Sequence, residues 1–348
     1  MSAIPADTSP DLLASEPPAS SGPRGGADLI RATRPFAEER PLRTWFELLF
    51  TSALTAGTWT AAFAAPWLGL RLVASLITAL LIVRLFIIYH DAMHGAVFRQ
   101  SRLGHAAMWV IGLLTLSPPP VWRETHDYHH KNNCKLPGTA IGSYPIVTTR
   151  MWRRMSPAER RTYTIARHPL FMAAGYFTIF SAGMCLGSFA RNPKMHWAGP
   201  VALLLHAAAF TLVFFTLGWQ ATVLSAWLPL GVSFALGSYL FYAQHNYPDV
   251  VIADRQRWNY HDAALSSSSM FEMSPLMHWF TGNIGYHHIH HLNHRIPFYN
   301  LPEAMRAIPE LQSPGRTSWH PRDVAACFRL KLWDPSKGRM VGFQDARV

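Results

Sequence analysis

The sequence predicts an all-α integral membrane protein, with transmembrane helices and a cytosolic helical cap that carries a metal site. Hydrophobic residues make up 49% of the 348 positions and charged residues only 15%, which is typical of a membrane protein with polar flanks. Several apolar stretches approach the roughly 20 residues that an α-helix needs to cross a bilayer. Three clusters of histidines lie beside apolar sequence. Clustering of this kind indicates metal binding.

The first two apolar stretches, residues 45–64 and 68–89, predict a transmembrane hairpin with a short turn around Pro66. The second stretch ends directly before His90, so it delivers the first histidine cluster to one membrane surface. Arg84 lies within this stretch, where a charge is costly. We expect its side chain to reach toward the membrane interface, and pairing with an acid near the metals is the alternative.

A strongly basic loop follows the hairpin. Positively charged loops face the cytoplasm, so we expect this loop and its two histidine clusters on the cytoplasmic side. Within it, residues 106–116 are apolar but too short to cross, and Ser117 and three prolines follow them. We therefore expect a helix that dips into the membrane or packs on the core and returns to the same face. The basic residues are Arg99, Arg102, Arg123, Lys131, Lys135, Arg150, Arg153, Arg154, Arg160, Arg161 and Arg167.

Three further apolar stretches occupy residues 169–190, 200–217 and 222–242. All histidine clusters must meet on one side of the membrane, so the number of crossings between the second and third clusters has to be even. One of the three stretches therefore does not cross.

We expect residues 169–190 to be the stretch that stays on the cytosolic side. Three glycines interrupt it, and Arg191 and Lys194 follow it closely. The turn at 218–221 carries no charge, which suits the far side of the membrane. The expected architecture has four transmembrane helices, with both termini and all histidine clusters in the cytosol.

Both ends of the chain are expected to be tails. Residues 1–28 are rich in Pro, Ser, Ala and Gly and lack the basic start and apolar core of a signal peptide, so a disordered cytosolic tail is expected. Residues 311–348 are expected to be a cytosolic C-terminal tail. The net charge of +11 lies in loops that flank apolar stretches, so no nucleic-acid partner is expected. The three cysteines form no metal-binding motif.

The histidine clusters contain eight residues with helical spacing. Positions i, i+3 and i+4 share one side of a helix, so each cluster can direct its imidazoles at a single point. A tetrahedral zinc site needs only about four ligands, so eight predict two ions. Ligation by nitrogen without sulfur favours iron that performs oxygen chemistry over structural zinc. The residues are His90, His94, His126, His129, His130, His287, His290 and His291.

Four segments of the chain carry a resemblance to a known family. They are HDAMHGAVF from His90, HDYHH from His126, QHNYPD from Gln244 and GNIGYHHIHHLNHRIPFYNL from Gly282. In order and spacing the chain resembles the integral membrane fatty acid desaturases of the acyl-lipid, histidine-box type. The resemblance covers roughly residues 42–310, which we expect to form a desaturase domain. Membrane hydroxylases and ketolases that act on alkyl, fatty acyl or carotenoid substrates share these motifs, so they stay open as alternatives.

The resemblance implies that the eight histidines bind two non-haem iron ions together with a ninth histidine after the last span. His245 is the candidate, and a simple helix-capping role is the alternative. His288 lacks the shared spacing and is excluded, and His294 is expected to be a hydrogen-bonding neighbour. Ligating imidazoles usually donate their second N–H to a carboxylate or carbonyl. Candidates for this supporting role are Asp91, Asp127, Asp262 and Asn283, of which Asp91 and Asp127 have ordinary surface acids as the alternative.

The implied reaction uses O2 and external electrons to introduce a cis double bond into the acyl chain of a membrane lipid or acyl thioester. Tyr89, Trp122 and Trp279 are candidates for the wall of an acyl channel. The motif at Arg167 lacks the glycines of a cytochrome b5 haem motif, so a separate donor, with ferredoxin the natural candidate, is expected. The expected location is the bacterial inner membrane, with the active site on the cytoplasmic face.

Two other classes of protein share single features. HDAMH is similar to the zinc protease motif HExxH, but Asp91 stands where the catalytic Glu belongs, and the other clusters would be surplus. A metal transporter would place histidines within its spans rather than at their ends. Metal content separates the three classes, since an oxygenase would hold two irons, a protease one zinc and a transporter loosely exchanging ions.

Overall fold

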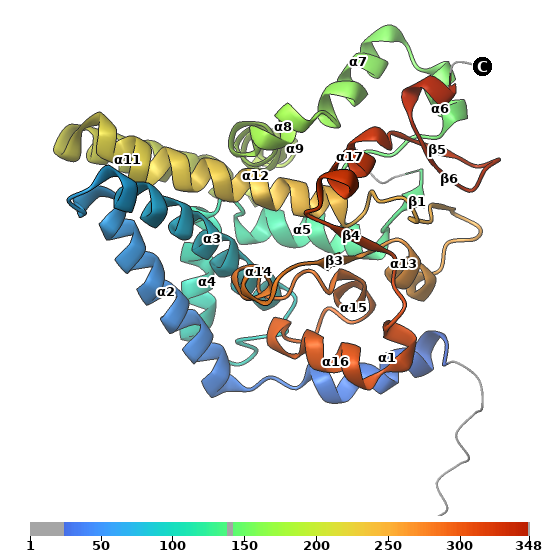
Figure 1. The fold of residues 1–348 in the computed structure, drawn as a ribbon, viewed down its shortest axis with the longest axis horizontal. Helices are drawn as coiled ribbons and strands as arrows, with labels where there is room; N and C mark the ends of the chain where they lie inside the picture. Colours follow the sequence, from blue (N-terminus) through green and yellow to red (C-terminus); the bar gives the residue numbers. More distant parts are fainter. Residues whose placement is uncertain (1–23, 138–141, 347–348) are drawn as a thin grey trace, which may run out of the picture.

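The computed structural model describes residues 24–137 and 142–346, and most of these residues are helical (Figure 1). Six short strands also occur, paired as β1 with β2, β3 with β4, and β5 with β6. The expected N-terminal tail, 1–28, falls mainly outside the described residues. Its last residues are structured, because α1 (Gly26–Thr33) begins within it and Arg24 forms an ion pair with Glu310.

The first hairpin consists of α2 (Pro41–Ala64) and α3 (Leu68–Met93). Pro41 starts α2 at a position where its missing N–H costs no hydrogen bond, and Pro66 separates the two helices. Helix α3 continues past the apolar stretch and carries His90 in its last turn. The expected hairpin is therefore present, with its second helix longer than the apolar pattern alone indicated.

The second hairpin runs through α11 (Ala198–Thr222), the π-helical η3 (Val223–Trp227) and α12 (Leu228–Ala243). Gly218 has φ +80° and ψ 175° and breaks the helix, a conformation that glycine adopts readily because it has no Cβ. The break lies within the expected turn at 218–221. By length and hydropathy, two helical segments of the described chain could cross a membrane, namely Leu68–Met93 and the bent Pro193–Ala243.

The turns of the two hairpins lie side by side at one end of the molecule, at the left of Figure 1. The Trp59 indole N–H donates to the Ser225 carbonyl at 2.7 Å, and the Arg71 guanidinium donates to the Gln220 side chain at 3.2 Å. Since both hairpins turn there, the opposite ends of α3 and α12 also come together. Those ends carry the histidines.

Two shorter helices connect the first hairpin to the rest of the chain. Helix α4 (Arg102–Leu114) packs against α3 and α11, and α5 (Pro119–Lys131) begins after the proline run. The Tyr89 hydroxyl donates to the Ser117 carbonyl at 2.5 Å, which ties the connection between these helices to α3. The apolar 106–116 stretch thus contributes to a 13-residue helix, α4, shorter than a membrane span.

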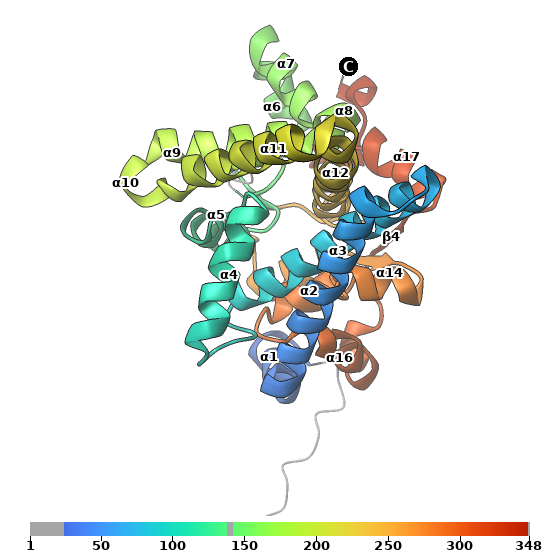
Figure 2. The ribbon, with the colours of Figure 1, turned by 90° about the vertical axis from the view of Figure 1, so that its left-hand side faces the viewer.

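The 169–190 stretch is not one continuous α-helix. It divides into α8 (Pro169–Ala173), the π-helical η2 (Tyr176–Gly187) and α9 (Ser188–Arg191). Neither candidate span includes it. Helices α6 (Thr149–Arg154) and α7 (Pro157–Ala166) precede it, and α10 (Pro193–His196) leads into α11. Figure 2 shows α9, α10 and α11 together, far from α1 and α16.

Further described segments, mainly those that follow α12, form the cap. The expected C-terminal tail folds against the end of α12, where the Tyr242 hydroxyl donates to the Cys327 carbonyl at 3.2 Å. The elements are β1 (Lys135–Leu136), β2 (Ala253–Asp254), α13 (Tyr260–Ser266), β3 (Met270–Glu272), α14 (Pro275–Phe280), α15 (His287–Leu292), η4 (Phe298–Asn300), α16 (Leu301–Ala307), η5 (Pro309–Leu311), β4 (Arg316–Ser318), α17 (Pro321–Arg329), β5 (Leu332–Asp334), β6 (Arg339–Val341) and η6 (Phe343–Ala346).

Candidate metal centre

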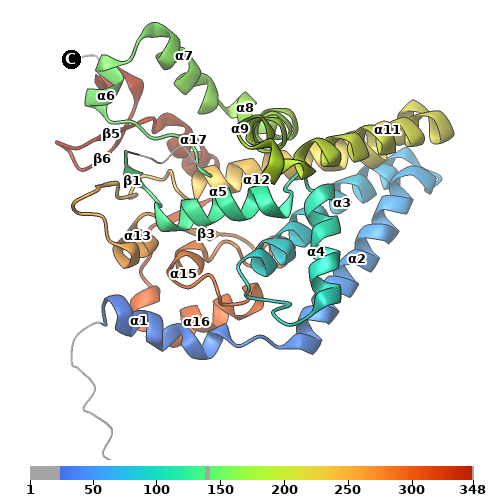
Figure 3. The same ribbon diagram turned by 180° about the vertical axis from the view of Figure 1, so that it is seen from behind.

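Nine histidines from the ends of α3 and α12 and from α5 and α15 converge in two groups. Within each group the candidate ligand nitrogens all lie within 4.8 Å of one another. Figure 3 shows α5 running above α15, the two helices that contribute to both groups. The five-histidine group consists of His90, His94, His126, His130 and His290, and the four-histidine group consists of His129, His245, His287 and His291.

Contrary to the expectation from spacing, the histidines of the second cluster do not all converge on one point, and neither do those of the third. In α5, His126 and His130 join the five-histidine group, whereas His129 joins the four-histidine group. In α15, His287 and His291 likewise stay together, and His290 joins the other group. Residues i and i+4 differ in direction by only about 40° around a helix, whereas neighbours differ by about 100°. Each of these helices therefore stands between the two groups.

The spacing of the nitrogens fits two metal ions. In the five-histidine group, the Nε2 atoms of His90 and His126 lie 2.9 Å apart, and those of His130 and His290 lie 3.1 Å apart. In the four-histidine group, the Nε2 atoms of His245 and His287 lie 2.9 Å apart. Ligands at about 2.0–2.1 Å from one metal are separated by about 2.9–3.4 Å, depending on the angle between them.

The protonation state of the imidazoles also fits metal binding. The Nε2 atom of His94 is buried without a hydrogen-bond partner among the described residues, as a nitrogen reserved for a metal would be. Burial and the neighbouring imidazoles hold the pKa of His126 and His290 well below its ordinary value, and burial lowers the pKa of His245 to about 4. Metals bind only unprotonated imidazole, so both groups are prepared for metal at neutral pH.

Asp91 lies against His90, where a supporting role was expected. His90 Nδ1 donates to Asp91 Oδ1 at 3.1 Å, which leaves His90 Nε2 for the metal. The Phe298 backbone N–H donates to the other carboxylate oxygen at 2.6 Å. Within the described residues, Asn283 forms no hydrogen bond to a cluster histidine. Its side chain donates at 3.0 Å to the carbonyl of Phe298, the residue whose backbone N–H holds Asp91. Asp91 is buried, so it is not a surface acid.

The other two supporting candidates were wrong. Asp127 and Asp262 are exposed, and neither side chain contacts a ligand in the described part of the chain. Asp127 follows His126 directly, so it lies about 100° away around α5 and faces solvent. Asp262 sits in the exposed first turn of α13.

His245 has a partner that sequence reasoning missed. Its Nδ1 donates to the backbone carbonyl of Ser267 at 2.9 Å, which directs Nε2 into the four-histidine group. A backbone carbonyl leaves no signal in a sequence, since every residue has one. The imidazole of His245 therefore belongs to the cluster, and Gln244 is the residue that ends α12.

His288 and His294 lie outside both groups. His288 Nε2 donates to the Leu311 carbonyl at 3.0 Å, so it points away from the clusters, as its offset spacing predicted. His294 was expected to form a hydrogen bond to the ligands. Instead its ring contacts the rings of His94 and His130, with centroid distances of 4.8 and 5.3 Å.

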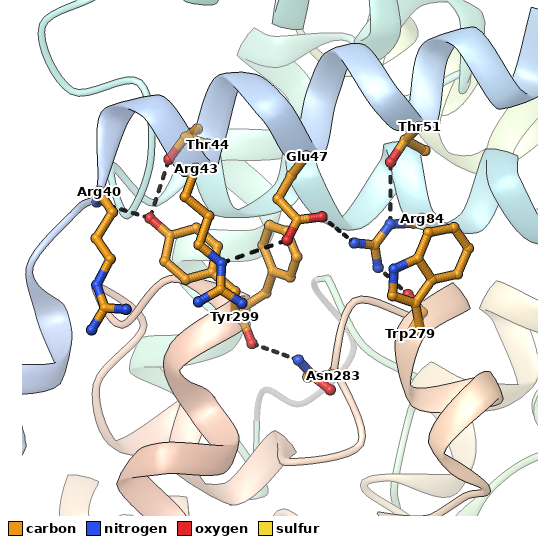
Figure 4. A network of polar contacts seen from close by, with 10 residues as sticks. Arg40, Arg43, Thr44, Glu47, Thr51, Arg84, Trp279, Asn283 and Tyr299 are labelled. Atoms are coloured by element: carbon orange, nitrogen blue, oxygen red, sulfur yellow. Dashed lines mark hydrogen bonds and ion pairs between the residues drawn. The ribbon is translucent and has the colours of Figure 1, made fainter.

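The preferred expectation for Arg84, that it reaches the membrane interface, was wrong. Its side chain is buried and forms an ion pair with Glu47 Oε2 at 2.5 Å (Figure 4). It also donates to Thr51 Oγ1 at 3.1 Å and to the Trp279 carbonyl, and it stacks over the Trp279 ring. Arg84 thus connects α2, α3 and the cap segment before the third cluster. The acid comes from the neighbouring helix, which the sequence pattern of α3 could not reveal.

A cavity of about 430 Å³ opens beside the five-histidine group. His126 forms part of its wall, together with mainly apolar residues of α3, α5, η2 and α12. Trp122 lines it as expected, but Tyr89 and Trp279 do not, since Tyr89 binds Ser117 and Trp279 stacks on Arg84. The ring of Phe241, another wall residue, lies 5.0 Å from that of His129. The cavity therefore adjoins the five-histidine group directly, and Phe241 lies between it and His129 of the four-histidine group.

These features define a helical membrane-type protein with two adjacent groups of buried histidines that are suited to bind metal, next to an apolar cavity. A family model described as "Fatty acid desaturase" matches residues 70–322, so the chain belongs to the fatty acid desaturase family. Membership makes it an oxidoreductase of lipid metabolism.

The curated relatives named here are also described as desaturases. A "Fatty acid desaturase" of Bacillus subtilis is 29% identical over 91% of this chain and 90% of its own length. An "sn-1 oleoyl-lipid 12-desaturase" of a Picosynechococcus strain is 24% identical over 78% of each chain. A chloroplastic omega-6 fatty acid desaturase of Arabidopsis thaliana is 25% identical, covering 76% of this chain and 58% of its own.

Proposed function

We propose that the protein is an O2-dependent di-iron desaturase that introduces a cis double bond into the acyl chain of a membrane lipid or acyl thioester. The observation that carries the proposal is the pair of neighbouring histidine groups, one of which contributes His126 to the wall of an apolar cavity. The rings of His130 and His291, one from each group, stack with centroids 4.3 Å apart, which supports two metals acting together.

The five-histidine group would hold one iron and the four-histidine group the other. Bound iron would supply the oxidising power to remove hydrogens from unactivated carbons, which no amino-acid side chain possesses. The protein would position the iron ions and the acyl chain. Trp122, Phe86 and Phe241 exclude water from the cavity next to His126, and Asp91 and the Ser267 carbonyl hold their histidines in the ligating orientation.

The proposal is tested by expressing the chain in a host that lacks unsaturated lipids. We expect new double bonds that depend on O2, located by mass spectrometry, and two irons per purified chain. Hydroxylated lipids without double bonds would assign the protein to the hydroxylases instead, and one zinc per chain would contradict the di-iron centre.

We further propose that α2, α3 and the two arms of the second hairpin cross the bacterial inner membrane, with the histidines facing the cytoplasm. Large apolar side chains are exposed along these helices, among them Phe46, Leu76, Leu212 and Phe215. In water such exposure would be costly, and in lipid it is favourable.

Thiol labelling of intact cells tests this topology. We predict that a membrane-impermeant thiol reagent modifies a Trp219→Cys variant, at the turn of the second hairpin, but not an Arg161→Cys variant on α7. Both positions are exposed, and the three native cysteines are buried, so the background is low. Labelling of Arg161→Cys from outside would contradict the proposed orientation.

Gly237 tests whether the cavity holds the acyl chain. It lines the cavity one helical turn from Phe241, and a Cβ added there meets no atom within 4 Å. We predict that Gly237→Leu fills cavity space without displacing protein atoms and therefore shifts the products toward shorter acyl chains, as measured by lipid mass spectrometry. Gly231→Leu, on the same helix with equally open surroundings but outside the cavity lining, should leave the product distribution unchanged.

A separate acidic carrier such as ferredoxin is the proposed source of electrons. The basic cytosolic loops favour an acidic partner, because complementary charge speeds encounter between proteins.

A further inference from the structure

The five-histidine group comes nearest to the surface at His94. The other eight histidines are buried, whereas His94, at the end of α3, is partly exposed as a residue although its Nε2 atom is buried within the group. The half-buried ring of His294 lies against it, at a centroid distance of 4.8 Å and an angle of 36°. A short path of imidazole rings therefore connects the outside of the protein to the metal ligands.

The position of His294 is fixed by the turn that follows α15. Asn293 ends this helix, and its side-chain oxygen accepts the Arg295 backbone N–H at 3.1 Å. The amide group of Asn293 donates to Thr33 Oγ1 at 2.8 Å, which anchors the turn to α1. His294 thus has a defined place over His94, unlike a free surface side chain.

Three exposed cations lie near this pair of rings. Lys131 and Arg295 interact electrostatically with His294, and Arg99 lies next to Arg295. Lys131 directly follows His130, and Arg99 donates to the carbonyls of Gly95 at 2.8 Å and Arg295 at 3.2 Å. None of the three forms an ion pair with an acid within residues 24–137 and 142–346.

In the described part of the chain, the nearest acids form no ion pairs with these cations, although the charge of Glu39 offsets part of theirs. The carboxylate of Glu39 accepts the backbone N–H groups of Phe98 and Arg99, at 2.6 and 3.2 Å, and not the Arg99 guanidinium. Asp28 pairs with Arg31. Asp127 lies one helical turn before Lys131 without pairing to it. The three cations outnumber Glu39 and Asp127, so the surface around His294 keeps a net positive charge.

The cavity adjoins the five-histidine group at a different histidine. His126 lines the cavity, and neither His94 nor His294 does. A partner on the basic surface would therefore not obstruct an acyl chain in the cavity, and the two could be bound at once.

We propose that the His94–His294 ring pair, framed by Lys131, Arg99 and Arg295, is the surface at which a small acidic one-electron carrier protein docks and delivers its electrons. The inference rests on the proposed di-iron function and locates the partner of that centre. Each docking oxidises the carrier by one electron and reduces one ferric ion to ferrous. Two dockings reduce both irons, and no bond forms or breaks.

Anaerobic stopped-flow reduction of the iron-loaded full chain by a reduced acidic [2Fe–2S] ferredoxin tests the proposal. Lys131→Glu combined with Arg295→Glu is expected to slow reduction at low salt by at least about tenfold and to weaken its dependence on ionic strength, because attraction becomes repulsion. The matched control is Arg322→Glu with Arg329→Glu, the same charge change on exposed positions of α17. It should keep the wild-type rate.

Two further measurements separate docking from folding and from electron transfer. Dithionite, a small reductant, should reduce the charge-reversed and wild-type chains equally fast, which shows that the centre is intact. His294→Ala should retain the iron content and the ferredoxin Kd but slow reduction by ferredoxin, since it removes a ring and not a charge.

The outcomes distinguish the two proposals. Equal rates for the charge-reversed chain and wild type, or equal losses in the α17 control, would overturn the docking surface, as would an iron-loaded wild type that ferredoxin cannot reduce. An unchanged rate in His294→Ala would overturn the role of the ring pair. A wild-type chain that binds no iron would instead overturn the proposed function.

Discussion

Replacement of His245 by alanine is expected to abolish desaturation and to lower the bound iron from two ions per chain to one. His245 supplies one of only four imidazoles in the four-histidine group, and the Ser267 carbonyl holds it in the ligating orientation. The five-histidine group does not include His245, so its iron should remain. Metal analysis of the purified variant and mass spectrometry of lipids from the expressing cells measure the two effects.

His288→Ala is the matched control, because His288 is also a buried histidine and lies beside His287. Its Nε2 contacts the Leu311 carbonyl and no ligand, so both irons should be retained. The variant should lose about 1–3 kcal/mol of stability, because the buried carbonyl is left without its hydrogen bond. Loss of an iron from His288→Ala, or two irons in His245→Ala, would show that the ligand assignment is wrong.

Arg84→Met is expected to destabilise the protein by about 3–5 kcal/mol, because it leaves the carboxylate of Glu47 in a largely buried site without its partner. Arg84 also holds the Trp279 carbonyl near the third histidine cluster, so part of the iron should be lost as well. Unfolding of the detergent-solubilised protein in increasing denaturant measures the stability.

Arg43 offers a control within the same network (Figure 4). It pairs with the other oxygen of Glu47 at 3.6 Å, but its side chain is 42% exposed. Arg43→Met should therefore cost only about 0–1 kcal/mol, as exposed ion pairs do. Adding Glu47→Leu to Arg84→Met should recover part of the loss, because no unpaired charge remains. Equal effects of the two single arginine variants would contradict the importance of burial.

Much of the fold could be read from local patterns. The helices on either side of Pro66, the break at Gly218 and the short α4 before the proline run all follow from residues close together in the chain. The short strands and the folded C-terminal segment were not foreseen. They depend on pairing between distant residues, such as Met270 with Arg316, that no local period indicates.

In the candidate site, too, some residues could be predicted from local sequence and others could not. Asp91 and Asp127 were both proposed because each directly follows a histidine of a cluster. The structure brings Asp91 into contact with His90, whereas Asp127 contacts no cluster histidine in the described part of the chain. The two acids have the same sequence relation to a histidine, and only the packing of α3 and α5 decides that one is buried and the other exposed. For Arg84, too, the partner came from another helix.

The sequence by itself pointed to the nine histidines that meet. Helical spacing, which is a local property, singled out eight of them, and the resemblance to the desaturase family added His245. Only the tertiary structure decided how the nine divide into groups of five and four, with α5 and α15 each serving both. It also placed His294 on His94, the Ser267 carbonyl behind His245 and the cavity beside His126. These relations join separate segments, and their geometry is set by how the helices pack against one another rather than by the order of residues within any one of them.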